Sequence, residues 1–130
     1  MIVLDASFVV EVLLAKPERA DLARRLAAAG PGTAVPHLVD AEVTSALRAL
    51  VRRGVLDERR AELALEDFVD LPLARHTHVG ILSRTFAISA GISAYGAVYV
   101  ALAEALGATL WTCDGRLASR AGSFVEVESF

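Results

Sequence analysis

Cysteine and long apolar runs are nearly absent from this sequence. Cys113 is the only cysteine, so no internal disulfide can form, and its place in a Trp-Thr-Cys-Asp stretch favours packing over catalysis. No uncharged apolar run reaches the roughly 18 residues that a membrane span needs, and no basic segment precedes the apolar start of the chain. We therefore expect a cytoplasmic protein that neither crosses a membrane nor carries a signal peptide.

Lysine is almost missing, and the overall charge is negative. Only Lys16 among the 13 basic residues is a lysine, and the net charge is -3 at pH 7. A chain with this charge does not hold nucleic acid through a broad basic field, so any phosphate contact must be local. Most arginines stand beside Glu or Asp on expected helices, where solvated ion pairs are the usual outcome.

Apolar residues are abundant, at 55% of the 130 residues. Short apolar runs predict strands, and helical spacing of apolar residues predicts helices between them. The strands are expected at 2–4, 33–35, 71–73, 109–112 and 124–127, and the helices at 8–14, 17–29, 38–53, 57–70, 77–91 and 93–106. This alternation predicts one domain over residues 1–130, a three-layer α/β/α sandwich with a short, mostly parallel central sheet.

The stretch from Ser93 to Leu117 combines a helix, a turn, a strand and an acidic loop. Ser93 is a helix N-cap by type, and Gly107 supplies the left-handed residue that ends a helix. Asp114 comes two residues after the expected strand 109–112. In an open parallel sheet that position is at the carboxyl edge, where ligands usually bind.

Three carboxylates are expected at that edge. Asp5 follows the first strand, Glu42 lies one turn into the helix after the second, and Asp114 follows a later one. Carboxylates that converge repel one another unless a cation neutralises them, which favours Mg²⁺ or Mn²⁺. Such an ion activates water for attack on a phosphodiester. Ser7 and Thr112, two residues from Asp5 and Asp114 respectively, are placed to orient a ligand carboxylate or a metal-bound water.

Other interpretations of these acids stay open at this point. Asp5 and Asp114 are also ordinary helix or turn caps, and Glu42 is also a first-turn acid favoured by the helix dipole. Two further phosphate-chemistry folds gather acids at a sheet edge, and the sequence argues against both. Dehalogenase-like hydrolases place a second aspartate where Ser7 stands, and receiver domains need a lysine after a late strand.

Four segments together resemble the PIN domain, and within it the small VapC-type toxins of bacterial toxin–antitoxin pairs. They are Ile-Val-Leu-Asp-Ala-Ser, Val-Asp-Ala-Glu-Val, Ser-Ala-Tyr-Gly-Ala-Val-Tyr-Val-Ala-Leu-Ala-Glu and Leu-Trp-Thr-Cys-Asp-Gly-Arg-Leu, which extend the likeness over the whole chain. The resemblance implies a metal-dependent endoribonuclease that cuts RNA of the tRNA or rRNA class. It also implies a VapB-type antitoxin partner, a homodimer, and contact with DNA only through the antitoxin.

The chain departs from the family pattern at Gly96, where an aspartate directly follows the tyrosine of the third segment in relatives. Glycine within a helix lowers helix stability by on the order of 1 kcal/mol relative to alanine, so the expected helix gives no structural reason for a glycine here. We consider two origins, an inactivating substitution or a natural three-carboxylate site, and expect weakened or absent cleavage from either. The alternative function is a non-catalytic module that binds an antitoxin-like protein. Arg116 and Arg84 are the first arginines to test for contact with RNA phosphate.

Overall fold

A five-stranded parallel sheet forms the centre of the molecule. The computed structural model describes residues 1–130. The strands are β1 (Ile2–Leu4), β2 (Thr33–Pro36), β3 (Ala74–His76), β4 (Thr109–Thr112) and β5 (Val127–Ser129), in the order β3-β2-β1-β4-β5. Every neighbouring pair is parallel. Leu4 of β1 lies opposite Trp111 of β4, so these two strands end close together at the same edge.

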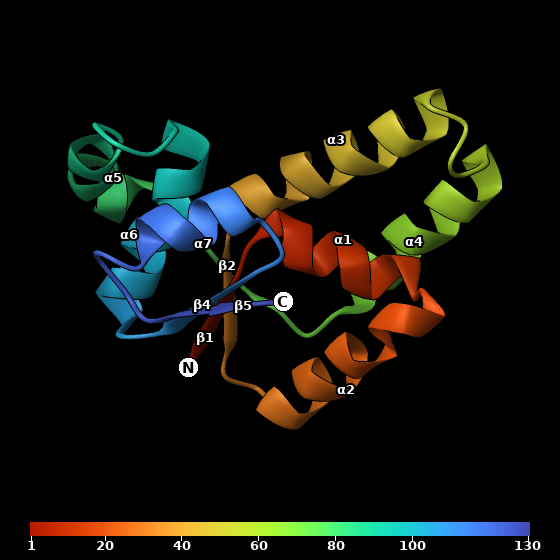
Figure 1. Ribbon diagram of the computed structural model, residues 1–130, viewed down its shortest axis with the longest axis horizontal. Coiled ribbons are helices and arrows are strands. Elements are labelled where there is room, and N and C mark those ends of the chain that lie inside the picture. The colour runs from red at the N-terminus through yellow and green to blue at the C-terminus, as the bar shows by residue number, and fades with distance from the viewer.

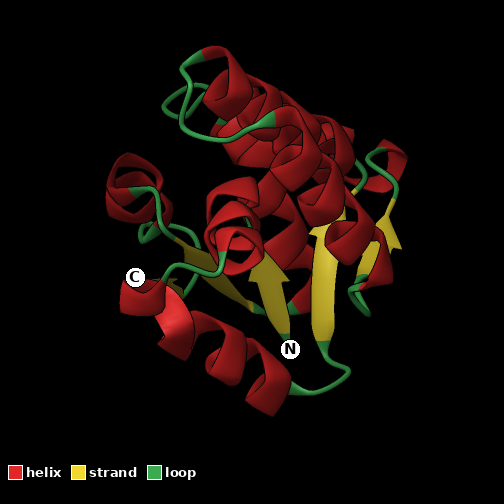
Figure 2. Ribbon diagram, turned by 90° about the vertical axis from the view of Figure 1, so that its right-hand side faces the viewer, coloured by secondary structure: helices red, strands yellow, loops and turns green.

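Seven α-helices surround the sheet (Figure 1). They are α1 (Ala6–Leu14), α2 (Ala20–Ala29), α3 (Leu38–Arg52), α4 (Glu58–Asp70), α5 (Leu82–Ile88), α6 (Ala94–Leu106) and α7 (Gly115–Ala121), with 3-10 turns at Pro17–Arg19 and Val79–Ile81. Figure 2 shows helices on two sides of the strands, which confirms the expected three-layer α/β/α fold. None of the helices combines the length and the apolar character needed to cross a membrane.

Helix α6 carries the largest share of the core on its side of the sheet. Its residues from Ala97 to Ala103 are all buried, and it packs against β1, β2 and β4. A helix that is apolar all round is stable only when it is covered on every side. Its capped N-terminus, at Ser93, is thereby held beside the carboxyl edge of the sheet.

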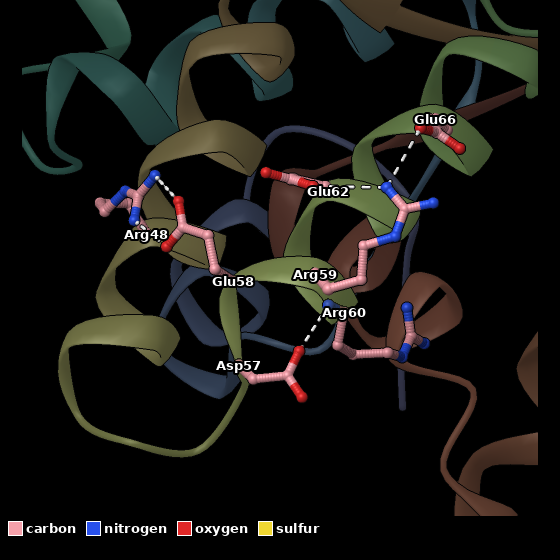
Figure 3. A network of polar contacts seen from close by, with 7 residues as sticks. All are labelled: Arg48, Asp57, Glu58, Arg59, Arg60, Glu62 and Glu66. Atoms are coloured by element: carbon pink, nitrogen blue, oxygen red, sulfur yellow. Dashed lines mark hydrogen bonds and ion pairs between the residues drawn. The ribbon is translucent and has the colours of Figure 1, made fainter.

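Helices α3 and α4 form a hairpin that extends away from the sheet (Figure 1). Its exposed side chains are linked by ion pairs, drawn in Figure 3. Arg48 donates two hydrogen bonds of 2.9 Å to Glu58, and Arg59 lies 3.3 Å from Glu62. Such solvated pairs contribute little to stability. The expectation that arginines beside acids form solvated pairs therefore holds for Arg59, whereas Arg60 instead donates to the carbonyls of Leu13 at 2.8 Å and Leu14 at 3.3 Å.

Several element boundaries differ from the expectation. Helix α1 begins at Ala6, two residues before the expected start at residue 8, and its N-cap is Asp5, the role that was left open for this residue. Asp5 takes that role because its carboxylate accepts the Phe8 amide proton at 3.0 Å. The helix expected over 77–91 is a 3-10 turn followed by the shorter α5.

Both sheet edges are shifted along the chain. The strand expected at 71–73 was wrong, because pairing with β2 begins at Ala74, opposite Ala34. The last strand is Val127–Ser129 rather than 124–127, since the amides of Phe124 and Val125 bond to the Ala121 carbonyl and close α7. Helix α7 itself was not predicted and stands where an acidic loop was expected.

Candidate functional site

The strand order reverses direction between β1 and β4, and a pocket of about 390 Å³ opens beside that point. In open parallel sheets, ligands bind in the crevice at such a switch point. The pocket is lined by acidic, basic, hydroxyl-bearing and apolar residues: Asp5, Glu42, Asp114, Arg116, Arg120, Ser7, Ser93, Tyr95, Tyr99, Ala6, Ile92, Gly96 and Leu117. All three sequence-predicted carboxylates therefore face one pocket, and Gly96 is part of its wall.

Asp5 is the most enclosed of the three acids, with 4% of its surface exposed. Its Oδ1 accepts hydrogen bonds from the Ser7 hydroxyl at 2.7 Å and the Phe8 amide at 3.0 Å, and its Oδ2 accepts one from the Thr112 hydroxyl at 2.7 Å. Burial raises the pKa of the Asp5 carboxyl, and the charge of Asp114 adds to this, while the hydrogen bonds oppose it. The three donors keep a buried carboxylate from being left without partners.

The Ser7 and Thr112 hydroxyls connect the two loops that carry Asp5 and Asp114. Ser7 Oγ accepts the Cys113 amide proton at 2.9 Å, and Thr112 Oγ1 accepts the Asp114 amide proton at 2.9 Å. Both hydroxyls thus touch Asp5 and a backbone amide of the β4–α7 loop. This is the arrangement expected of groups that orient a ligand carboxylate.

Replacing Thr112 should weaken the fold measurably. Thr112→Val keeps the shape of this fully buried side chain but removes one donor to Asp5 and one acceptor for the Asp114 amide. Leaving such groups unpaired costs about 1–3 kcal/mol, so we expect a loss of about 2 kcal/mol in the free energy of unfolding by urea titration. Thr109→Val on the same strand is the control, since its hydroxyl makes only an exposed contact to Glu126. Equal effects in the two variants would contradict this role for Thr112.

Glu42 is held from the opposite side by a residue that sequence reasoning did not single out. The Tyr99 hydroxyl on α6 donates to Glu42 Oε1 at 2.6 Å, and Tyr99 is only 2% exposed. Burial raises the pKa of the Glu42 carboxyl, the charge of Asp5 adds to the rise, and the Tyr99 hydrogen bond opposes it. The available sequence signal was a hydroxyl within the otherwise apolar run from Ala97 to Ala103.

Asp114 has two roles in the structure. It is exposed and lines the pocket, and it also caps α7 by accepting the amide protons of Arg116 at 2.9 Å and Leu117 at 3.2 Å. Both capping bonds use Oδ1. The cap interpretation and the site interpretation are therefore compatible for this residue, as they are for Asp5.

Gly96 is the third residue of α6, and its amide donates to the Ser93 hydroxyl at 3.2 Å. A Cβ at this position would lie 3.0 Å from Ile92 Cγ2 and 3.1 Å from Leu117 Cδ1. Two apolar side chains thus close over the position at which the family resemblance led us to expect an acid. Leu117 Cδ1 is the far end of its side chain and can yield by a few tenths of an ångström, whereas Ile92 Cγ2 is bonded to the Cβ of a β-branched, buried residue and has less freedom.

The acids fit a cation held by few protein ligands rather than a closed metal cage. No three His, Cys, Asp or Glu side chains gather tightly enough to form a ready metal cluster. The acids are nevertheless close enough to interact electrostatically, because the charge of Asp114 raises the pKa of Asp5 and the charge of Asp5 raises the pKa of Glu42. Mg²⁺ is usually bound through one or two carboxylates and keeps several waters, which suits this donor set.

The two arginines named from sequence lie in different surroundings. Arg116 lines the pocket, whereas Arg84 makes two hydrogen bonds to Glu104, at 2.6 and 3.0 Å, and is not among the lining residues. Arg120 lines the pocket and was missed, because the helix that aligns it with Arg116 was not expected.

Burial raises the pKa of the Cys113 thiol to about 11, which agrees with a packing role.

Comparison with known proteins identifies a family and close relatives. The PIN domain model matches residues 2–123. The chain is 38% identical to Ribonuclease VapC12 of Mycobacterium tuberculosis over 98% of each chain, and 44% identical to Ribonuclease VapC9 of the same species over 90% of this chain and 88% of that one. Among solved structures it resembles M. tuberculosis VapC20, described as a Sarcin-Ricin loop cleaving toxin, with TM-score 0.72 at 18% identity over 98% of this chain and 99% of that one.

Proposed function

The chain belongs to the PIN-domain family, and on that premise we propose that it is the toxin of a type II toxin–antitoxin pair, a Mg²⁺- or Mn²⁺-dependent endoribonuclease with a weakened site. The observation that carries the proposal is the gathering of Asp5, Glu42 and Asp114 around one pocket at the switch point of the sheet. The curated relatives that cover most of the chain bear the name ribonuclease, which supports the reaction class.

Each residue around the pocket has a distinct task in this proposal. Asp5, Glu42 and Asp114 would hold the cation, which keeps several of its waters, and the bound cation would polarise a phosphoryl oxygen and lower the pKa of a water. The Thr112 and Ser7 hydroxyls keep the Asp5 carboxylate in place, and the Tyr99 hydroxyl keeps that of Glu42 in place. Gly96 leaves the site one carboxylate short of the family pattern.

The proposed partners follow from the same premise. They are an RNA of the tRNA or rRNA class, a VapB-type antitoxin and a second copy of this chain, with DNA reached only through the antitoxin. A second candidate function is a non-catalytic module that binds an antitoxin-like protein. The closure of Ile92 and Leu117 over Gly96 favours this candidate, because it puts apolar groups where relatives carry an acid.

Cleavage of RNA by the purified chain tests the proposal. We expect slow cleavage with millimolar Mn²⁺, products that carry a 5′-phosphate, and no cleavage after addition of EDTA. Asp114→Asn removes one charge at the pocket while keeping a capping oxygen for α7, and it should lower the rate by at least about 100-fold. Cleavage that persists in EDTA, or that is equal in Asp114→Asn, would overturn the proposal and indicate a contaminating nuclease.

A further inference from the structure

The pocket has a second wall, opposite in charge to the three acids. Arg116 and Arg120 lie four residues apart on α7, so their side chains occupy the same helix face, and both line the pocket. Neither takes part in an ion pair, unlike Arg25, Arg48, Arg59, Arg75 and Arg84. Arg120 makes one hydrogen bond, to the Gly91 carbonyl at 3.3 Å. Two guanidinium groups without a carboxylate partner therefore stand at the pocket.

Tyr95 completes this wall with an exposed aromatic ring. It is the second residue of α6, lines the pocket and is 64% exposed, in contrast to Tyr99 on the same helix at 2%. Its hydroxyl makes no hydrogen bond within the protein, unlike that of Tyr99. A large ring held at the mouth of a polar pocket offers a flat face to a ligand.

A contact at Gly96 links the two helices that carry this wall. Leu117 of α7, between the two arginines in sequence, is 8% exposed, and its Cδ1 lies 3.1 Å from the place of a Cβ at Gly96. The side chain of Leu117 therefore packs on the first turn of α6. The arginines on α7 and Tyr95 on α6 line the same pocket.

We propose that Tyr95, Arg116 and Arg120 form a subsite for one unpaired nucleotide of the substrate, next to the acids. The arginines bind a phosphate and the tyrosine ring stacks on a base, a contact that every base can make. A base in a duplex has both faces covered by its neighbours, so the subsite selects single-stranded or looped segments. This inference rests on the proposed nuclease function and names the residues that would hold a nucleotide beside the acids.

The charge of the pocket lining determines how well the subsite attracts phosphate. Three carboxylates and two arginines line the pocket, so its lining carries a formal charge of -1 without a cation. A divalent cation brings the total to +1, and phosphate then meets the cation on one side and the two arginines on the other. We therefore expect nucleic acid to bind more tightly in the presence of a divalent cation than in EDTA.

Binding of labelled oligonucleotides, measured by fluorescence anisotropy, tests the subsite. The probes are an unstructured ten-nucleotide RNA, a DNA of the same sequence and a blunt-ended RNA duplex without unpaired bases, all with Ca²⁺ as the cation. We expect Arg116→Ala and Arg120→Ala each to weaken RNA binding about tenfold. Each should also make the slope of log affinity against log salt concentration shallower by about the amount that one phosphate contact contributes. Arg52→Ala, at the far end of α3 (Figure 1), makes the same change at an exposed arginine without an ion pair and should bind within about twofold of the unaltered chain.

Substitution of the ring separates stacking from charge. Tyr95→Leu should weaken binding of the single strand between about 5- and 100-fold without changing the salt dependence, whereas Tyr95→Phe should bind like the unaltered chain. The duplex should bind more weakly and be insensitive to Tyr95→Leu. DNA should bind about as well as RNA, because neither the ring nor the arginines contact a 2′-hydroxyl in this arrangement.

Two results would overturn the subsite: equal losses in Arg52→Ala and Arg116→Ala, or binding of the single strand that is unaffected by Tyr95→Leu. Its failure is distinguishable from failure of the proposed nuclease function. If the variants show the expected binding pattern but no RNA is cleaved, the subsite is supported and the nuclease function is contradicted. If RNA is cleaved but the binding pattern is absent, the nuclease function is supported and the subsite is contradicted. Thermal unfolding of each variant shows that a loss of binding is not a loss of fold.

Discussion

Gly96→Asp is expected to raise the Mn²⁺ affinity and the RNA cleavage rate of this chain by at least about tenfold. The new carboxylate would enter the first turn of α6, where the helix dipole favours an acid, and would face the pocket that Asp5, Glu42 and Asp114 already line. Metal ligands and the groups that orient them typically change affinity or activity by about 10–100-fold. Calorimetric titration with Mn²⁺ and a cleavage time course measure the two effects separately.

The controls for this change separate charge from bulk. Gly96→Asn adds almost the same volume without the charge, and Gly96→Ala adds only the Cβ that approaches Ile92 and Leu117. A gain of up to about 1 kcal/mol from replacing a helical glycine is offset by these tight contacts, so all three variants should unfold close to the unaltered chain. An aspartate variant that binds and cleaves no better than the asparagine variant would remove position 96 from the site and favour the non-catalytic module.

Glu42→Gln is expected to have opposite effects on activity and stability. It removes a carboxylate from the pocket and should lower Mn²⁺ affinity and cleavage by about 100-fold or more. At neutral pH it should also raise the melting temperature by about 2–4 °C, because a neutral side chain at this place carries no desolvation cost and still accepts the Tyr99 hydrogen bond. Glu42 is partly exposed, and solvent screening limits the gain to about 1 kcal/mol or less.

The pH dependence of the same variant follows from the direction of the pKa shifts. The pKa values of Asp5 and Glu42 are raised in the fold, so the stability they confer is present below their unfolded pKa values and is lost as pH rises through the folded ones. We expect the difference between Glu42→Gln and the unaltered chain to vanish in acid and to grow toward neutral pH. Added Mn²⁺ should stabilise the unaltered chain more than the variant.

Glu104→Gln is the matched control for that experiment. Hydrogen bonds from Arg84 lower the pKa of Glu104, so this carboxylate stabilises the fold above its unfolded pKa and less so in acid. The same chemical change should therefore lower the melting temperature at neutral pH instead of raising it. Melting curves that shift in the same direction for both variants would contradict the claim that the Glu42 carboxylate is desolvated beside other acids in the pocket.

Local signals explain which elements could be predicted from the sequence. Helix α6 begins and ends as expected, because Ser93 caps its first turn and Gly107 adopts the left-handed conformation at its end. Strand β4 is an apolar run in the middle of the sheet and was also predicted with its observed bounds. The edge strands were misplaced because pairing with one neighbour, rather than composition, decides where they begin. Helix α7 has seven residues and a glycine at its start, which gives too little periodicity to detect.

The residues of the site likewise fall into those that sequence patterns predict and those that depend on how the helices pack. The three acids and the two hydroxyls could be predicted to meet, because the topology of a parallel sheet brings the ends of its strands to one edge. Tyr99, Tyr95 and Arg120 could not be found from the sequence, since their positions depend on how α6 and α7 pack. The metal ligands, the subsite and the effect of Gly96 remain predictions that the experiments above test.

The hydroxyl contacts around Asp5 give the site a fixed polarity. The amides of Cys113 and Asp114 can only donate, so the hydroxyl oxygens of Ser7 and Thr112 must accept from them and turn their own protons toward the Asp5 carboxylate. The Ser7 hydroxyl also lies 3.3 Å from that of Thr112, but its contact to Asp5, at 2.7 Å, is the shorter one. Asp5 is thereby an acceptor on both of its oxygens before any ligand arrives.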